Sequence, residues 1–139
     1  MYKLIVFIFI LPLFLSGQNC DSVSVHIIKK YEPYSVKQFE QLKKKKKIDP
    51  EILYEVAEFK RNKGSDDFKS WYINFIDLTF ANLNCDKGQH YGLLYRLGKA
   101  YYYTGNFEKA KTFFYKDAAA KSKEACLDYY TKLSESQAK

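Results

Sequence analysis

Hydrophobic positions along this chain follow two different spacings. Between residues 23 and 27 they alternate with polar residues, which predicts a short strand or an extended segment. From residue 35 onward they recur every three or four positions, which is the spacing of one face of an α-helix. Ser35 can cap the first such helix, whose apolar residues are Val36, Phe39 and Leu42. The pattern therefore predicts a helical chain with a short irregular segment near its N-terminus.

Residues typical of helix ends divide the rest of the chain into five helices. Asp49 can accept hydrogen bonds from unpaired backbone N–H groups, and Pro50 suits the first helical position. Gly64 is a typical C-terminal stop, while Asp66 or Asp67 can cap the next helix. The expected helices cover residues 50–62, 68–83, 89–104, 107–120 and 122–135. Because helices of this length with short connections pack as antiparallel hairpins, the sequence predicts an all-α fold.

An internal repeat is visible when the chain is shifted by 41 residues. Aromatic, aliphatic, small and turn residues then coincide, in the pairs Tyr54/Tyr95, Val56/Leu97, Ala57/Gly98, Gly64/Gly105 and Cys85/Cys126. A fixed period of this size is typical of stacked helical hairpins. The sequence therefore predicts two copies of one hairpin, of which the second is the clearer.

The second copy resembles a tetratricopeptide repeat. The resemblance rests on the run from Leu94 to Tyr101, on the turn residues Gly105, Asn106 and Phe107, and on Ala110 and Phe114 in the next helix. Gly98 and Ala110 are small where the two helices of a hairpin should cross most closely. The resemblance covers residues 91–124, and a degenerate copy covers residues 50–84, where Trp71 replaces an expected small residue. It implies a short α-solenoid of antiparallel hairpins over residues 49–136, closed by a C-terminal capping helix.

The same resemblance implies a protein or peptide partner, held on the concave surface formed by the first helix of each hairpin. Tyrosines with interleaved charges suit such recognition, because a tyrosine ring offers a wide contact area with one polar group. The residues expected there are Tyr54, Glu58, Arg61 and Asn62 from the first copy, and Tyr95, Lys99, Tyr102 and Tyr103 from the second.

The N-terminus has the order of a secretory signal peptide. Lys3 precedes an uncharged apolar run from Leu4 to Leu15, and small or polar residues follow at positions 16–18. Twelve helical residues span roughly 18 Å, which is too short for a hydrocarbon core of about 30 Å. We therefore expect residues 1–18 to be a cleavable signal and the protein to be periplasmic, envelope-associated or secreted. Residues 19–48 then form an N-terminal segment with a lysine-rich end.

The composition fits one domain with a real core, since 47% of the 139 residues are hydrophobic and 18% are aromatic. An oxidising compartment permits a disulfide, but the sequence cannot choose a pair among Cys20, Cys85 and Cys126. The formal net charge is +7, which suits anionic partners. An alternative function is therefore binding to an anionic lipid or polyanion through the consecutive residues Lys43, Lys44, Lys45, Lys46 and Lys47.

No motif in the sequence supports catalysis. There is no glycine-rich phosphate loop, no HExxH, no nucleophile elbow and no EF-hand loop. The cysteines form no CxxC pair and have no nearby histidine, and the lysine block has no interleaved aromatic residues. We therefore expect no enzyme activity, no cofactor, no metal site and no nucleic-acid partner.

Overall fold

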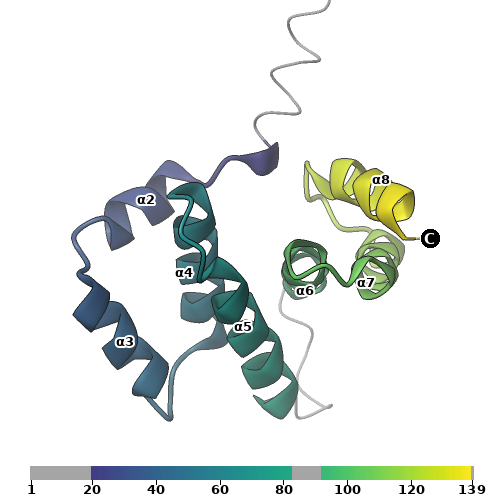
Figure 1. Ribbon diagram of the computed structural model, residues 1–139. Coiled ribbons are helices and arrows are strands. Elements are labelled where there is room, and N and C mark those ends of the chain that lie inside the picture. Colours follow the sequence, from purple (N-terminus) through teal and green to yellow (C-terminus); the bar gives the residue numbers. More distant parts are fainter. Residues whose placement is uncertain (1–19, 83–91, 139) are drawn as a thin grey trace, which may run out of the picture.

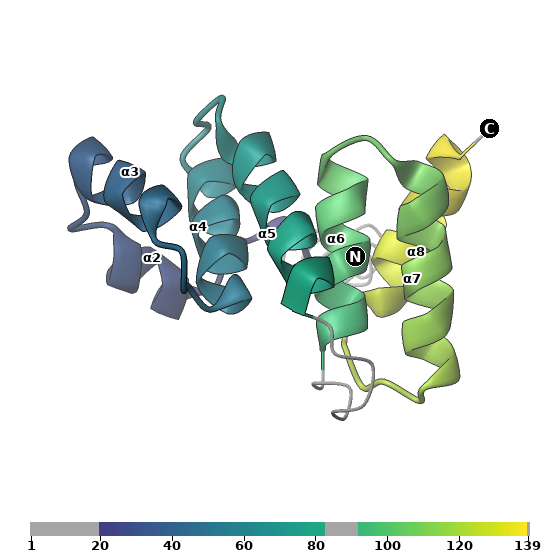
Figure 2. The ribbon, with the colours of Figure 1, turned by 90° about the horizontal axis from the view of Figure 1, so that it is seen from below.

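The computed structural model describes residues 20–82 and 92–138, and this part of the chain contains helices and no strand. Figures 1 and 2 show the helices packed side by side in chain order. The helices whose bounds lie within the described residues are α2 (Val25–Tyr31), α3 (Val36–Lys44), α4 (Pro50–Asn62), α5 (Phe68–Asn82), α6 (Leu93–Tyr103), α7 (Phe107–Ala119) and α8 (Leu127–Gln137). The all-α prediction is confirmed for these residues, whereas the expected signal peptide at 1–18 lies outside them.

Neighbouring helices make the main contacts. Helices α4 and α5 form one closely packed pair and α6 and α7 form another, while α5 packs on α6 and α7 packs on α8. Alternate helices also meet, because α2 packs on α4 and α6 on α8. The arrangement is compatible with a helical repeat fold.

The predicted strand or extended segment at residues 23–27 is wrong, because α2 begins at Val25. The Ser24 hydroxyl accepts a hydrogen bond from the Ile27 backbone N–H and so caps this helix. The fully buried Tyr31 follows Ile27 by four residues, so both can lie on one helical face. Five alternating residues were too few to separate this pattern from a short helix.

Helix α3 begins where Ser35 was expected to cap it. Ser35 and Gln38 form a reciprocal capping box, in which each side chain accepts a hydrogen bond from the other residue's backbone N–H. The buried Phe39 ring lies 5.9 Å from Phe59 on α4 and 6.1 Å from Trp71 on α5, measured between centroids. Trp71 is large where a small residue was expected because its ring reaches α3.

The ends of α4 also follow the sequence signals. The Asp49 carboxylate accepts from the Glu51 backbone N–H, and Pro50 is the first helical residue. Gly64 stops the helix with φ of +69°, in the left-handed region that glycine adopts most easily. Asp67, expected as a cap of α5, uses its carboxylate to accept from the side chains of Lys60, Ser65 and Trp71.

The crossing of α6 and α7 depends on a missing side chain. A Cβ atom at Gly98 would lie 2.5 Å from the Phe114 ring, so only glycine fits here without a shift. Ala110 is fully buried in the same hairpin. Asn106 caps α7 by accepting from the Lys109 backbone N–H. The expectation that small residues mark this crossing is confirmed.

The last helix begins later than predicted. Residues 120–126 form turns and irregular backbone, in which the Ser122 hydroxyl accepts from the Glu124 backbone N–H, and α8 starts at Leu127. Cys126, just before this helix, forms a disulfide with Cys20 across a sequence separation of 106 residues. The first described residues are thereby fixed beside α8 (Figure 1).

Among the described residues, no helix combines the length and the apolar character needed to cross a membrane.

Candidate functional site

Most of the residues predicted to face a partner contact one another and are buried or partly buried. Tyr54, Glu58 and Lys99 are buried, while only Asn62 is exposed. The remaining members are partly buried: Arg61, Tyr95, Tyr102 and Tyr103. The structure therefore brings the predicted face together, but much of it lies in the contact between α4 and α6.

Glu58 is the centre of this contact. It is 3% exposed, and its Oε2 atom accepts from Lys99 Nζ at 3.0 Å and from Arg61 Nη2 at 3.2 Å. Its other oxygen accepts from the Tyr72 hydroxyl, which in turn accepts from Arg61 Nε at 3.3 Å. Glu58 and Lys99 are 41 residues apart, which is the shift of the predicted repeat, and they carry opposite charges and pair.

A second ion pair joins the same two helices closer to solvent. Arg96 Nη2 lies 2.9 Å from Glu51 Oε1, and both side chains are partly exposed. Glu51 precedes Glu58 by two turns, while Arg96 precedes Lys99 by about one. We call this line of four charged residues, Glu51, Glu58, Arg96 and Lys99, the α4–α6 seam.

The cations of the site lie among tyrosine rings. Lys99 is 5% exposed, and its Nζ atom lies 5.1 Å from the centroid of Tyr130 and within 6.0 Å of the centroids of three more tyrosines. The Arg61 guanidinium lies 4.2 Å from the Tyr103 centroid. Ring faces attract cations, and this attraction strengthens where water is excluded. The tyrosines thus partly replace the water that the buried cations have lost.

Glu58 is charged in this setting. Burial alone would raise its pKa, but the Lys99 ammonium, the Arg61 guanidinium and the Tyr72 hydrogen bond hold the pKa of Glu58 below its ordinary value. Burial, with the neighbouring Glu58 charge adding to it, raises the pKa of Tyr72, so its hydroxyl stays a donor. Glu58 is therefore ionised at neutral pH, while burial lowers the pKa of Lys99 and the Glu58 charge opposes that shift.

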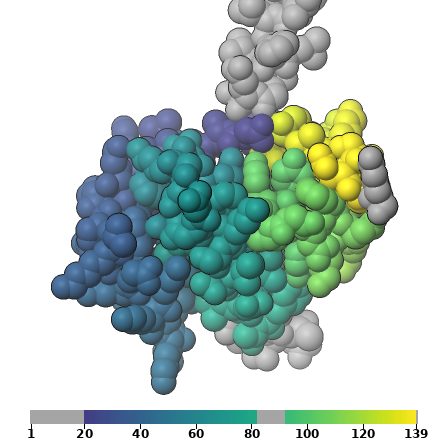
Figure 3. All heavy atoms as spheres, in the orientation of Figure 1, coloured from purple at the N-terminus to yellow at the C-terminus, as the bar shows by residue number. Residues whose placement is uncertain are grey.

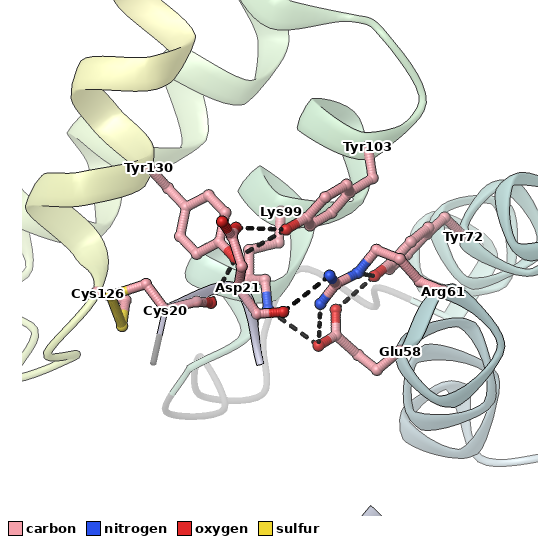
Figure 4. Close-up of polar contacts among 9 residues, drawn as sticks. All are labelled: Cys20, Asp21, Glu58, Arg61, Tyr72, Lys99, Tyr103, Cys126 and Tyr130. Carbon is pink, nitrogen blue, oxygen red and sulfur yellow. Dashed lines mark hydrogen bonds and ion pairs between the residues drawn. A yellow bond between two sulfur atoms is a disulfide. The ribbon is translucent and has the colours of Figure 1, made fainter. Parts of the chain in front are cut away.

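The chain's own N-terminal residues cover one side of this cluster. Asp21 follows the disulfide-bonded Cys20, and Figure 4 shows it between the tyrosines of α6 and α8 and the Arg61 guanidinium. The Arg61 Nη1 atom donates to the Asp21 backbone carbonyl at 3.0 Å. The Tyr130 hydroxyl donates to the Cys20 carbonyl at 2.6 Å. Two adjacent carbonyl groups are thus bound by side chains of α4 and α8.

The Asp21 carboxylate is held by tyrosine hydroxyls. Tyr129 donates to its Oδ2 atom at 2.9 Å, and Tyr103 donates to its Oδ1 atom at 3.2 Å. The Tyr130 hydroxyl lies 3.4 Å from Oδ1 and 2.9 Å from the Tyr103 hydroxyl. Burial and the bond to Asp21 raise the pKa of Tyr129 to about 12, so this hydroxyl is a donor at neutral pH. We call Arg61, Tyr103, Tyr129 and Tyr130 the Asp21 site.

Sequence reasoning missed Asp21, Tyr129 and Tyr130. Asp21 lies 108 residues from Tyr129, and the tetratricopeptide resemblance does not reach either end of the chain. Cys20 and Cys126, each next to one side of the site, were the available signal, but three cysteines left their pairing open. Cys85 lies outside the described residues.

The alternative site at the lysine block is a separate surface. Lys43 is partly buried, with its Nζ atom 4.9 Å from the Trp71 centroid and 3.8 Å from a Glu40 oxygen. Lys44, Lys45, Lys46 and Lys47 are exposed at the end of α3 and after it. Four of the five ammonium groups can therefore meet an external anion.

Across residues 20–82 and 92–138, no three side chains of histidine, cysteine, aspartate or glutamate gather as metal ligands would. Comparison of the chain with protein-family models, with curated proteins and with solved structures finds no match.

Proposed function

We propose that this protein is an exported helical-repeat module that binds a protein partner along the row of α2, α4, α6 and α8. In this proposal, these four helices form the concave layer of a short tetratricopeptide-like solenoid, and α3, α5 and α7 form its outer layer. The observation that carries the proposal is the Asp21 site, where side chains of α4, α6 and α8 hold a piece of polypeptide by its carbonyls and its carboxylate. Surfaces that bind a peptide in this way are typical of recognition modules.

Export is part of the same proposal. The disulfide between Cys20 and Cys126 supports it, since such bonds persist in oxidising compartments. The partner would then be a periplasmic, envelope or extracellular protein. It would contact the parts of the row that remain accessible, including the outer end of the α4–α6 seam and the partly exposed Tyr95 and Tyr102.

The experiment is capture of envelope and secreted proteins on the immobilised chain, with seam variants. Replacing Tyr95 and Tyr102 by alanine would confuse binding with folding, because both rings pack on Tyr130. Arg96→Glu is the better change, since it reverses a partly exposed charge at small cost in stability. We expect the wild type to retain one stoichiometric protein at about 0.1 M and about 0.5 M salt, and Arg96→Glu to lose it.

Two controls distinguish an effect of the seam residues on capture from an effect of the changed net charge. Lys69→Glu makes the same reversal at an exposed position of α5 and should keep the partner. Combining Glu51→Lys with Arg96→Glu keeps the ion pair within the protein but reverses the charges that a partner meets, so this protein should fold normally and still fail to capture. Equal capture by all four proteins would contradict the proposal.

The exposed lysines after α3 support the second candidate, binding to an anionic surface. In that case the immobilised chain recovers a lipid or polyanion, and this material is lost at the higher salt. Replacing the lysines at positions 44–47 by serine then abolishes recovery, whereas Arg96→Glu does not.

A further inference from the structure

We infer that the Asp21 site is a binding site for an acidic peptide segment of a partner, and that the Cys20–Cys126 disulfide, while intact, holds Asp21 in the site and so excludes that segment. This inference rests on the proposed function, and it names the chemistry of the partner and the step that admits it.

The basic groups near the site favour an anion. Glu58 is the ion-pair partner of both Arg61 and Lys99, while the Asp21 carboxylate accepts from tyrosine hydroxyls and lies beside this cluster. Removing Asp21 leaves Glu58 as the acidic partner of two basic side chains, of which Lys99 is nearly inaccessible to water. A site with one unbalanced positive charge and poor hydration favours a negatively charged ligand.

The hydrogen-bond donors specify a peptide carboxylate. Without Asp21, the Tyr129 hydroxyl loses the carboxylate acceptor that it has in this structure, and the Tyr103 hydroxyl keeps only the Tyr130 hydroxyl as a neighbour. At the same time Arg61 Nη1 and the Tyr130 hydroxyl lose the carbonyl groups of two adjacent residues. A free inorganic anion could satisfy the first set of donors but not the second. An aspartate or glutamate within a peptide satisfies both.

The segment that contains Asp21 lies at the surface, from which it can dissociate. Asp21 itself is exposed, and Figure 3 shows the first described residues at the surface next to the yellow α8. The segment is held covalently on one side by the disulfide and on the other by the chain leading into α2. Opening the disulfide leaves it attached on one side only, so a second peptide can compete for the site.

A dithiol protein or small molecule would open the bond by thiol–disulfide exchange. One thiolate of the dithiol attacks a sulfur of the Cys20–Cys126 bond, which breaks as a mixed disulfide forms. The second thiol of the reductant then displaces the remaining cysteine. The reductant ends as a disulfide, and Cys20 and Cys126 become thiols after taking up two electrons and two protons. Both cysteines are partly exposed, so exchange can reach them.

The test uses a labelled synthetic peptide with the sequence of residues 19–24, acetylated, amidated and carrying Cys20→Ser. Binding is measured by fluorescence polarisation to the oxidised wild type, to an open variant with Cys20→Ser and Cys126→Ser, and to the open variant with Asp21→Ala added. We expect no binding to the oxidised protein, binding to the open variant, and about tenfold tighter binding once Asp21 no longer competes. A peptide with Asp21→Asn should bind about tenfold more weakly.

Two substitutions that each remove one tyrosine hydroxyl show whether the peptide binds at the Asp21 site. Tyr129→Phe in the open Asp21→Ala protein should weaken the peptide about tenfold. Tyr115→Phe removes a hydroxyl that bonds Glu135 on another surface, and it should change nothing. Binding that ignores Tyr129, or that is equal for the aspartate and asparagine peptides, would overturn the inference.

If the open proteins do not fold, a variant that keeps the disulfide can be used to test the same site. Asp21→Ala in the oxidised protein should be stabilised by acetate, measured as a rise in Tm over equal chloride, whereas the wild type should not. Absence of this rise would also overturn the inference. Partner capture that persists at the α4–α6 seam while both tests fail would leave the proposed function standing without this site.

Discussion

At the scale of single residues, the feature that organises the molecule is a buried carboxylate with two cationic partners. The Glu58 carboxylate accepts three hydrogen bonds, from Arg61 on the same helix, from Tyr72 on α5 and from Lys99 on α6. Removing one member of a buried ion pair is strongly destabilising, because the other charge remains buried without compensation. Glu58 is therefore a residue on which stability should depend steeply, and with a characteristic dependence on pH.

Glu58→Gln should lower the free energy of unfolding by about 3–5 kcal/mol at neutral pH. The pKa of Glu58 is lower in the folded protein than its ordinary 4.5, so its contribution is complete above that value and is lost as pH falls through the folded pKa. Urea unfolding from about pH 7 to about pH 3 should show the difference between wild type and Glu58→Gln shrinking as pH falls. Glu135→Gln, at an exposed glutamate, is the control and should cost little. A Glu58→Gln difference that stays constant with pH would contradict the charged state assigned to this residue.

At the scale of helices, the sequence predicted best those features that depend on neighbours in the chain. The caps Ser35, Asp49 and Asn106 and the stop Gly64 lie where the pattern placed them, because a cap is a contact over two to four residues. The short α2 was misread, since its helical face is recognised only once Tyr31 is known to be buried.

Gly98→Ala should test the crossing of α6 and α7. The added Cβ would meet the Phe114 ring at 2.5 Å, and overpacking of this kind costs about 1–3 kcal/mol. In a Phe114→Leu protein the same change should cost less, because the ring that it meets is gone, although Phe114→Leu is destabilising by itself. The measurement is a double-mutant cycle of urea unfolding free energies. Additive costs of the two changes would mean that glycine is present for a reason other than this contact.

At the scale of the whole molecule, contacts between the two ends of the chain complete the candidate site. The Asp21 site joins Asp21 to residues of α4, α6 and α8, and the disulfide fixes the same two ends. Periodicity carries no information about contacts over such separations. Glu58 and Lys99 could be placed on one face from the predicted 41-residue repeat, although their pairing was not predicted. Asp21 and Tyr129 lie outside both predicted copies, so their contact needed the structure.

The disulfide should stabilise the molecule globally rather than only near α8. Closing a loop of about 100 residues removes about 4.7 kcal/mol of chain entropy from the unfolded state, and the bond here spans 106 residues. A protein with Cys20→Ser and Cys126→Ser should therefore remain folded but lose about 4 kcal/mol. Because the effect acts on the unfolded state, the slowest-exchanging amides of α4, α5, α6 and α7 should all lose the same protection in native-state hydrogen exchange. Loss of protection confined to α8 and residues 20–24 would mean instead that the bond only holds the Asp21 segment in its site.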